Sequence, residues 1–155
     1  MESLTRQTEA RYNLPHGTCR AFALQESHYD SSATREEGTY FNQGSRYARQ
    51  ITKDAAAFLV EHPGLPLSIE RGQRSVSYGM FQIMGNNYRL LGDTDIYIVP
   101  TLEEQFDYFG KFVSPLFAKY RSLARVASAY NTGSPDKTGI SYVSHVLSYQ
   151  HKFTY

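Results

Sequence analysis

The sequence predicts a mainly α-helical (all-α) protein that folds as a single domain over residues 1–155, with at most a minor β-hairpin. Two observations carry this prediction. Apolar residues recur three and four positions apart in segments spread along the chain, which is the spacing of α-helices with one buried face. A chain of 155 residues can enclose one sizeable core, and this one contains no repeat, no low-complexity segment and no clear domain boundary.

The composition narrows the classes of function. The 16 Lys and Arg residues nearly balance the 15 Asp and Glu residues, and a net charge of +1 argues against a nucleic-acid binder. The single cysteine, Cys19, excludes an internal disulfide and a cysteine-based metal cluster, and the five histidines show no ligand spacing. We therefore expect no metal and no cofactor. Residues 1–16 lack the apolar core of a signal peptide, and no apolar run is long enough for a membrane span.

Aromatic residues are abundant, with 13 Tyr, 9 Phe and no Trp. Tyrosine is apolar and also able to form hydrogen bonds, so a surface rich in tyrosine suits a sugar. The alternative is that most of these rings simply pack in the core. The composition does not decide between these two interpretations.

The helix that we expect from Leu14 to about Ser27 carries the most informative residue. Asn13 can cap this helix, and Pro15 suits its first turn. One face combines three apolar or small residues with a carboxylate: Cys19, Phe22, Ala23 and Glu26. Burial on such a face disfavours the charged form of a carboxylate, raises its pKa and keeps it protonated, as a general acid requires. The alternative is a helix-end glutamate turned toward solvent.

The same spacing predicts the other elements. They are a polar helix over residues 1–12, an irregular segment over 29–44, a helix over 47–59, a loop over 63–76, and helices over 102–113, 116–130 and 140–153. His62-Pro63-Gly64 should end the helix over 47–59, and Ser114-Pro115 should begin the helix over 116–130. Gly133 gives that helix a strong C-terminal stop.

A second motif, Gly79-Met80-Phe81-Gln82, lies in a mostly apolar stretch. Gly79 permits a close approach of the backbone to a neighbouring group. The Gln82 side chain offers a donor and an acceptor, which suits the acetamido or hydroxyl group of a sugar. The alternative is a turn in the core whose glutamine is satisfied by the protein itself.

Four short motifs follow one another along the chain: Glu26-Ser27, Gly79-Met80-Phe81-Gln82, Ala129-Tyr130-Asn131-Thr132-Gly133, and Tyr142-Val143 followed by Val146-Leu147. In this order they resemble the soluble lytic transglycosylase family of the lysozyme-like superfamily, to which goose-type lysozymes are related. The resemblance covers about residues 10–153. The long run between the first two motifs is similar to that of phage and mobile-element variants, in which an Arg-x-Glu segment and aromatic residues follow the catalytic helix. The counterparts here would be Arg35, Glu37 and Tyr40.

The resemblance implies a lysozyme-like helical fold with a cleft for the glycan strands of peptidoglycan. It implies that Glu26 is the catalytic acid and base. The residues that would shape the sugar subsites are Ser27, Tyr40, Gly79, Met80, Phe81, Gln82, Tyr130, Asn131 and Tyr142. It further implies a monomer that acts on the bacterial cell wall in the periplasm. Delivery would be within a phage particle or by a lysis system, together with other virion or lysis-system proteins.

The chain departs from the family pattern at three places. Gly-Met-Phe-Gln replaces the more usual Gly-Leu-Met-Gln, and Thr132 replaces an alanine. Thr138 stands where some members carry an acidic residue, although Asp136 is nearby.

Glu26 is the one carboxylate that the sequence places well, whereas most glycosidases use two. A lytic transglycosylase needs only one. Glu26 would protonate the glycosidic oxygen between N-acetylmuramic acid and N-acetylglucosamine and then take the proton of the muramic acid C6 hydroxyl, which closes on C1. The product would be a 1,6-anhydro sugar. Two alternatives stay open: a goose-type muramidase that uses water, and a non-catalytic wall-binding or virion structural module.

Overall fold

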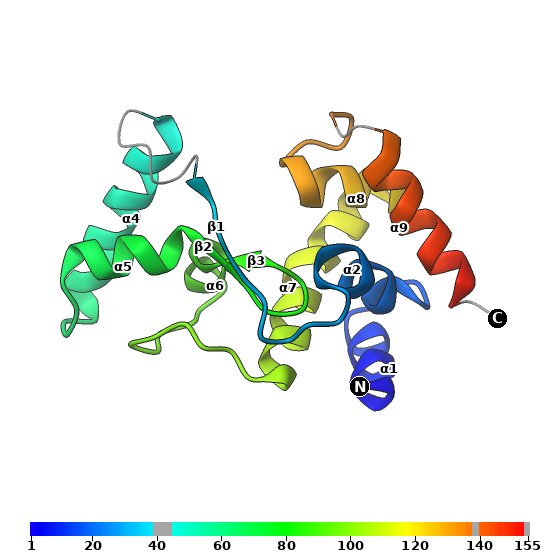
Figure 1. Cartoon of the computed structure of the whole chain (residues 1–155), viewed down its shortest axis with the longest axis horizontal. Helices are drawn as coiled ribbons and strands as arrows, with labels where there is room; N and C mark the ends of the chain where they lie inside the picture. Colours follow the sequence, from blue (N-terminus) through cyan, green and yellow to red (C-terminus); the bar gives the residue numbers. More distant parts are fainter. Residues whose placement is uncertain (39–44, 138–139, 154–155) are drawn as a thin grey trace.

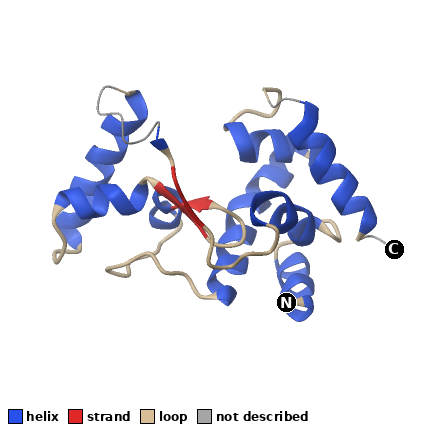
Figure 2. Cartoon of the chain, viewed as in Figure 1, coloured by secondary structure: helices blue, strands red, loops and turns tan. Residues whose placement is uncertain are grey.

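The computed structural model describes residues 1–38, 45–137 and 140–153. It confirms the mainly α-helical class and shows a small antiparallel sheet (Figure 1, Figure 2). In chain order the elements are α1 (Glu2–Arg11), α2 (Thr18–Ser27), β1 (Thr34–Glu36), α4 (Arg46–Glu61), α5 (Leu67–Arg74), β2 (Val76–Tyr78), β3 (Ile83–Met84), α6 (Gly85–Leu90), α7 (Leu102–Tyr120), α8 (Leu123–Thr132) and α9 (Ile140–Lys152). No helix in the described part of the chain has the length and apolar character needed to cross a membrane.

The helices form two lobes on either side of the sheet (Figure 1). The larger lobe consists of α1, α2, α7, α8 and α9; within it, α9 packs against α2 and α8, and α7 packs against α1 and α8. The smaller lobe consists of α4, α5 and α6, and its α5 packs against both other helices. Helices that lie far apart in the sequence, such as α2 and α9, are thus neighbours in space.

Phenylalanine rings fill the larger lobe. Phe22 of α2, Phe106 and Phe109 of α7, and Phe81 of the turn after β2 are each at most 2% exposed. Phe81 stacks on Phe109 with ring centroids 4.1 Å apart and meets the edge of Phe106 at 5.1 Å. Full burial of one such side chain stabilises a fold by about 1.5–3 kcal/mol. The turn of the sheet is therefore anchored in the core of the larger lobe.

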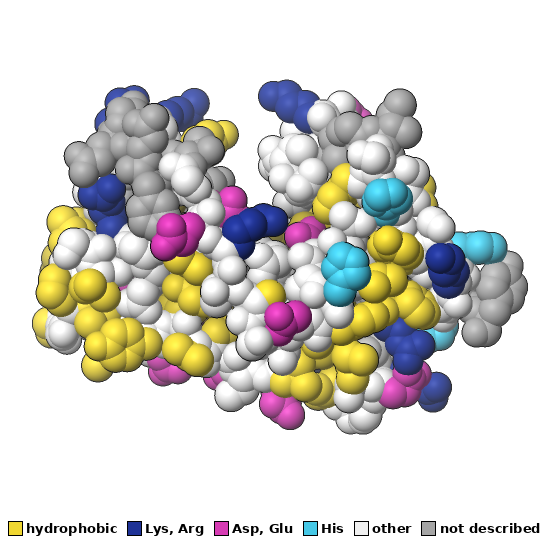
Figure 3. Space-filling view, in the orientation of Figure 1, with side chains coloured by type: hydrophobic (Ala, Val, Ile, Leu, Met, Phe, Trp, Pro, Cys, Tyr) yellow, Lys and Arg dark blue, Asp and Glu magenta, His cyan; other side chains and the backbone are white. Residues whose placement is uncertain are grey.

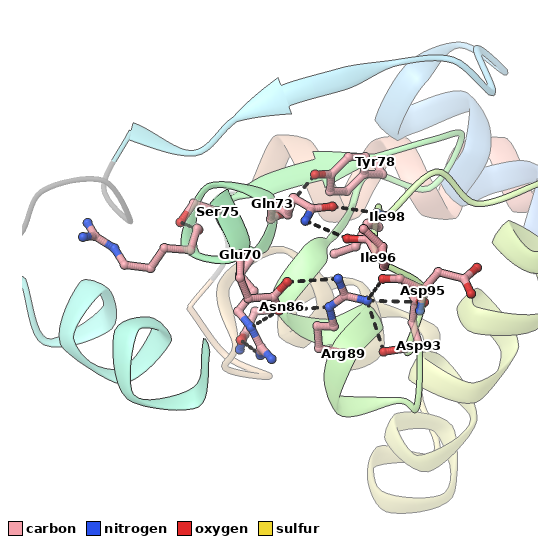
Figure 4. A network of polar contacts seen from close by, with 12 residues as sticks. Glu70, Gln73, Ser75, Tyr78, Asn86, Arg89, Asp93, Asp95, Ile96 and Ile98 are labelled. Atoms are coloured by element: carbon pink, nitrogen blue, oxygen red, sulfur yellow. Dashed lines mark hydrogen bonds and ion pairs between the residues drawn. The ribbon is translucent and has the colours of Figure 1, made fainter. Parts of the chain in front are cut away.

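A buried ion network joins the helices of the smaller lobe (Figure 4). Glu70 of α5 accepts hydrogen bonds from Arg74 Nε at 2.8 Å and from Arg89 Nε and Nη2 at 3.0 Å. All three side chains are at most 3% exposed. The guanidinium carbons of the two arginines lie 5.3 and 4.5 Å from the ring centroid of Phe58. The Glu70 carboxylate thus links α5 to α6, and the contact of the two arginines with the Phe58 ring links both helices to α4.

The same network holds the irregular segment before α7 (Figure 4). Arg89 Nη1 donates to the backbone oxygen of Asp95 at 2.7 Å. Gln73 of α5 donates to the oxygen of Ile96 at 3.0 Å and accepts from the backbone nitrogen of Ile98 at 2.7 Å. These bonds satisfy backbone groups that no helix or strand pairs, so the segment is held close to the smaller lobe.

The sheet has the strand order β1-β2-β3, and both pairs are antiparallel. The β2–β3 hairpin confirms the predicted minor hairpin. Its turn contains Gly79 and Gln82, with positive φ angles of 73° and 49°. A Cβ on Gly79 would lie 2.4 Å from the Gln105 side chain of α7, so this position requires glycine. The predicted close approach therefore takes place between the turn and α7.

Several predicted helices are confirmed, while two boundaries around prolines were wrong. The predicted loop over 63–76 contains α5, because Glu70 and Arg74 form a buried i,i+4 ion pair that Arg89 of α6 completes. Pro115 lies inside α7 rather than at the start of a new helix. The apolar face of α7 continues past it through Leu116 and Phe117, which pack on the core. That burial offsets the cost of a proline in a helix interior, which is about 3 kcal/mol for the missing hydrogen bond and the clash of the ring together.

The start of α2 also differs from the prediction. Asn13 adopts a left-handed conformation before the helix, and Gly17 occupies the N-cap position. The Glu9 carboxylate of α1 accepts hydrogen bonds from the backbone nitrogens of Gly17 at 3.2 Å and Cys19 at 2.9 Å. The first turn of α2 is therefore capped from a neighbouring helix, a contact that local sequence spacing does not reveal.

Candidate active site

Glu26 lies at the wall of a groove of about 370 Å³ between the two lobes. Figure 3 shows the surface hollowed between the lobes, with acidic and basic side chains at the floor of the hollow. Residues of both lobes and of the sheet line the groove: Glu26, Arg35, Glu37, Tyr47, Ser77, Gln82, Ile83, Met84, Asn87, Phe112, Ala129, Tyr130, Asn131, Thr132 and Gly133. A groove with this mixture of carboxylate, amide, hydroxyl and aromatic side chains can bind a polar, ring-shaped ligand such as a sugar.

The predicted face of α2 is confirmed, and it explains the position of Glu26. Cys19, Phe22 and Ala23 are each at most 1% exposed, whereas Glu26 one turn later is half-buried. Its Oε1 accepts a hydrogen bond from the hydroxyl of Tyr142 on α9. The carboxylate thus lies where the apolar core of the larger lobe meets the groove.

The environment of Glu26 favours its protonated form. Burial raises the pKa of its carboxyl above the ordinary value, and this effect exceeds the opposing hydrogen bond from Tyr142 and the positive charge of Arg35. The negative charge of Glu37 raises the pKa of Glu26 further. Glu26 therefore meets the electrostatic requirement of a general acid.

Arg35 and Glu37 form a charge pair that lines the same groove as Glu26. They are two positions apart on an extended segment, so their side chains share one face. Glu37 Oε1 accepts from Arg35 Nε at 2.8 Å and from the Ser77 hydroxyl at 2.8 Å, and Arg35 Nη2 is also 2.8 Å away. The structure thus places in the groove Arg35 and Glu37, which the sequence offered as counterparts of the Arg-x-Glu segment.

Tyr130 lines the groove and also packs on the core beneath its surface. Its hydroxyl donates to the backbone oxygen of Phe81 at 2.5 Å, and its ring meets Phe22 and Phe112 at centroid distances of 4.9 and 5.4 Å. Burial raises the pKa of Tyr130 well above its ordinary value, so the hydroxyl stays protonated. Asn131, the next residue, lines the groove at the end of α8.

Four of the predicted subsite residues support the site without lining it. Met80 and Phe81 are 3% and 0% exposed and belong to the core. Ser27 donates to the backbone oxygen of Met80 at 2.8 Å, and Gly79 is in contact with α7 as described above. Their shared role is to hold the β2–β3 turn against α2 and α7.

Gln82 does line the groove, although its amide is partly committed to the protein. Its Nε2 donates to the backbone oxygens of Ala33 at 3.2 Å and Gly79 at 3.0 Å. The predicted subsite residue Tyr40 lies outside the described residues. The structure therefore brings together Glu26, Gln82, Tyr130, Asn131 and Tyr142 from the predicted set.

Some groove residues were not predicted from the sequence, among them Ser77 and Asn87. Ser77 lies between Val76 and Tyr78, and such an alternation is the signal of a short half-buried strand. Asn87 has no comparable signal. Among the residues that the structure describes, no three His, Cys, Asp or Glu side chains are grouped in a way that could hold a metal ion.

No protein-family model, curated protein or solved structure matches this chain. A half-buried carboxyl that is held by a tyrosine and faces polar side chains can donate a proton to a ligand in the groove and later take one back.

Proposed function

We propose that the protein is a peptidoglycan lytic transglycosylase, which cleaves the β-1,4 bond between N-acetylmuramic acid and N-acetylglucosamine. The observation that carries the proposal is Glu26: a half-buried carboxyl with a raised pKa, held by Tyr142 at the wall of a groove. The order of the four sequence motifs supports the same activity. The substrate would be the glycan strands of the bacterial wall.

In the first step, protonated Glu26 gives its proton to the glycosidic oxygen. The bond from that oxygen to C1 of the muramic acid breaks, and an oxocarbenium-like state forms. In the second step, the Glu26 carboxylate takes the proton of the C6 hydroxyl of the same sugar. The C6 oxygen forms a new bond to C1, which closes the 1,6-anhydro ring and returns Glu26 to its starting state. An internal nucleophile has the entropic advantage of an intramolecular reaction.

The neighbours of Glu26 would assist these steps by holding groups in place. Tyr142 fixes the orientation of the carboxyl through its hydrogen bond. Gln82 and Asn131 both line the groove and are suited to bind the acetamido groups of the sugars. Tyr130 holds the turn that carries Gln82, through the backbone oxygen of Phe81.

A goose-type muramidase is the second candidate, and Glu37 is the observation in its favour. A hydrolytic glycosidase normally uses a second carboxylate, and Glu37 lines the same groove as Glu26. However, Glu37 Oε1 is already held by Arg35 and Ser77. This engagement favours an electrostatic role for Glu37 over the activation of a water molecule.

The nature of the product tests the proposal. Purified peptidoglycan should yield muropeptides that end in 1,6-anhydro-N-acetylmuramic acid, that are lighter by one water than lysozyme products and that borohydride leaves unchanged. Mass spectra dominated by reducible muropeptides would instead support the muramidase. No cleavage by a well-folded protein would support a non-catalytic wall-binding or virion structural module.

The variant Glu26→Gln tests the residue. Because it keeps the shape of the side chain and removes the proton, turnover should fall by about 10²–10⁴-fold while the circular dichroism spectrum is unchanged. Glu103→Gln is a suitable control, since Glu103 is exposed on α7 and does not line the groove. If Glu26→Gln retained a tenth of wild-type turnover, another residue would have to be the acid.

We also propose that the protein acts on the wall in the periplasm as a monomer. Delivery within a phage particle or by a lysis system would suit such an enzyme, and virion or lysis-system proteins would then be its partners. Co-purification of the protein with assembled particles from infected cells would test this route.

A further inference from the structure

Arg35 and Glu37 face the same groove as Glu26, yet the mechanism above gives them no part. We propose that they are positioning residues: a charge pair, anchored by Ser77, that adjusts the protonation of Glu26 and hence the pH range in which the groove works. This inference rests on the proposed function, in that it takes Glu26 to be the acid. It assigns no contact between the pair and the substrate.

The geometry of the pair is fixed from two strands. Ser77 of β2 is the direct partner of Arg35 in the antiparallel ladder, so the two side chains emerge on the same face of the sheet. The Ser77 hydroxyl donates to Glu37 Oε1 at 2.8 Å, and Arg35 Nε donates to the same oxygen at 2.8 Å. The backbone nitrogen of Glu37 continues the ladder through a bond to the oxygen of Ser75 at 3.0 Å. Both charges are therefore held at defined positions in the groove.

The polar and charged groups near Glu26 come from several elements. From α9, Tyr142 donates a hydrogen bond, and from α8, the neutral Tyr130 hydroxyl is committed to Phe81. Within the described part of the chain, Arg35 and Glu37 are the full charges that act on Glu26, and they act in opposite directions. Burial and the Tyr142 hydrogen bond have the larger effects on the proton affinity of Glu26, and the balance of these two charges adjusts it further.

Glu37 affects that balance in two ways. Its own negative charge favours the protonated form of Glu26, and its carboxylate holds the Arg35 guanidinium at a fixed place. Loss of the Glu37 charge would remove the first effect and leave the positive charge of Arg35 uncompensated, so both changes would lower the pKa of Glu26. Loss of the Arg35 charge would raise it. The two single substitutions therefore have opposite predicted signs, which a purely structural role would not produce.

Solvent should reduce the size of these effects. The Arg35 side chain is 59% exposed and that of Glu37 is 23% exposed. Charges near the surface are screened by salt over about 10 Å at 0.1 M ionic strength. We therefore expect changes in the proton affinity of Glu26 on the order of threefold, larger at low salt than at high salt.

The experiment measures the titration of Glu26 in two independent ways. The first is the pH dependence of kcat/KM on purified cell walls. The second is the carbon-13 NMR titration of the labelled Glu26 carboxyl, assigned by the signal that is lost in Glu26→Gln. The variants are Glu37→Gln, Arg35→Gln and the double variant. The control is Glu36→Gln, which removes a charge next to Glu37 from an exposed position that does not line the groove.

The proposal predicts a distinct pattern. Glu37→Gln should lower the Glu26 titration midpoint, Arg35→Gln should raise it, and the double variant should return it close to that of the wild type. Glu36→Gln should leave it unchanged. Midpoints that move in the same direction in both single variants, or that do not move while turnover falls at every pH, would overturn the proposal.

The two readouts separate this proposal from the proposed function. Glu26-dependent cleavage of walls with an unmoved midpoint would reject the charge pair and retain the enzyme. The predicted NMR shifts in a protein that never cleaves walls would support the charge pair and reject the enzyme.

Discussion

In the larger lobe, Phe81 stacks on Phe109 within a cluster of apolar side chains. In the smaller lobe, Glu70 accepts hydrogen bonds from two buried arginines. Apolar contacts have little directional preference, so their contribution follows the area that they bury. A buried ion network depends on every partner, because a charge left without one pays the full cost of its removal from water. The two lobes should therefore respond very differently to small substitutions.

The groove is lined by residues from both the apolar larger lobe and the sheet beside the ionic smaller lobe. Glu26 extends from the apolar core of the larger lobe, whose low polarity favours its protonated form. Arg35 and Glu37 extend from the sheet beside the smaller lobe, whose interior contains the ion pairs of Glu70. We infer that a proton donor and a charge pair can share one groove because apolar burial keeps Glu26 protonated, whereas Ser77 and the ion pair itself hold Arg35 and Glu37.

The largest expected effect comes from Glu70→Gln. The substitution keeps the shape of the side chain but removes the negative charge that the buried Arg74 and Arg89 share, although Arg89 keeps its 3.5 Å ion pair with Asp93. We expect a loss of about 3–5 kcal/mol in the free energy of unfolding, measured with urea. The control is Glu2→Gln, because Glu2 is 47% exposed and its ion pairs with Arg6 and with Arg20 of α2 are open to solvent, where the loss of a partner costs about 0–1 kcal/mol.

Hydrogen exchange would show where this loss is felt. Amides of α5 and α6 should exchange faster in Glu70→Gln, while those of α7 stay protected. Equal acceleration in both lobes would mean that they unfold as one unit, and the contrast between them would then have no consequence for stability.

A smaller effect is expected for Phe109→Leu in the larger lobe. Leucine still fills most of the space, so the loss comes from a few ring carbons and the stacking with Phe81. We expect about 1–2 kcal/mol, again from urea unfolding. Val60→Ala is the control, because Val60 is 83% exposed and its truncation should change stability by less than about 0.5 kcal/mol. A loss as large as that of Glu70→Gln would show that the apolar lobe is no more tolerant than the ionic one.

The smallest expected effect is that of Glu26→Gln on stability, and its sign depends on pH. Because burial raises the pKa of Glu26, the folded state binds its proton more tightly than the unfolded state does. The resulting stabilisation is complete below the unfolded pKa of about 4.3 and is lost as the pH rises through the folded value. Glutamine does not titrate, so the variant should gain stability relative to the wild type between pH 4 and pH 7.

Melting temperatures of both proteins at the two pH values measure this difference. If Glu26→Gln instead lost stability relative to the wild type between pH 4 and pH 7, the result would contradict the burial of a protonated acid.

The sequence by itself determined the helical class and the position of Glu26 beside Cys19, Phe22 and Ala23. Helical spacing is a local property, because residues three and four apart share a face whatever the rest of the chain does. The stop at Gly133, whose φ of 73° suits glycine, was predictable for the same reason. Motif order was enough to suggest an activity, although it did not distinguish residues that line the groove, such as Gln82, from those that support it, such as Phe81.

Only the tertiary structure decided which polar groups meet. Tyr142 reaches Glu26 across 116 positions of sequence, and Glu9 caps α2 from another helix. The second carboxylate, Glu37, enters the groove because the pairing of β1 with β2 places it beside Ser77. These contacts depend on how the elements pack, and packing is decided by the burial of the whole chain rather than by the spacing within any one segment.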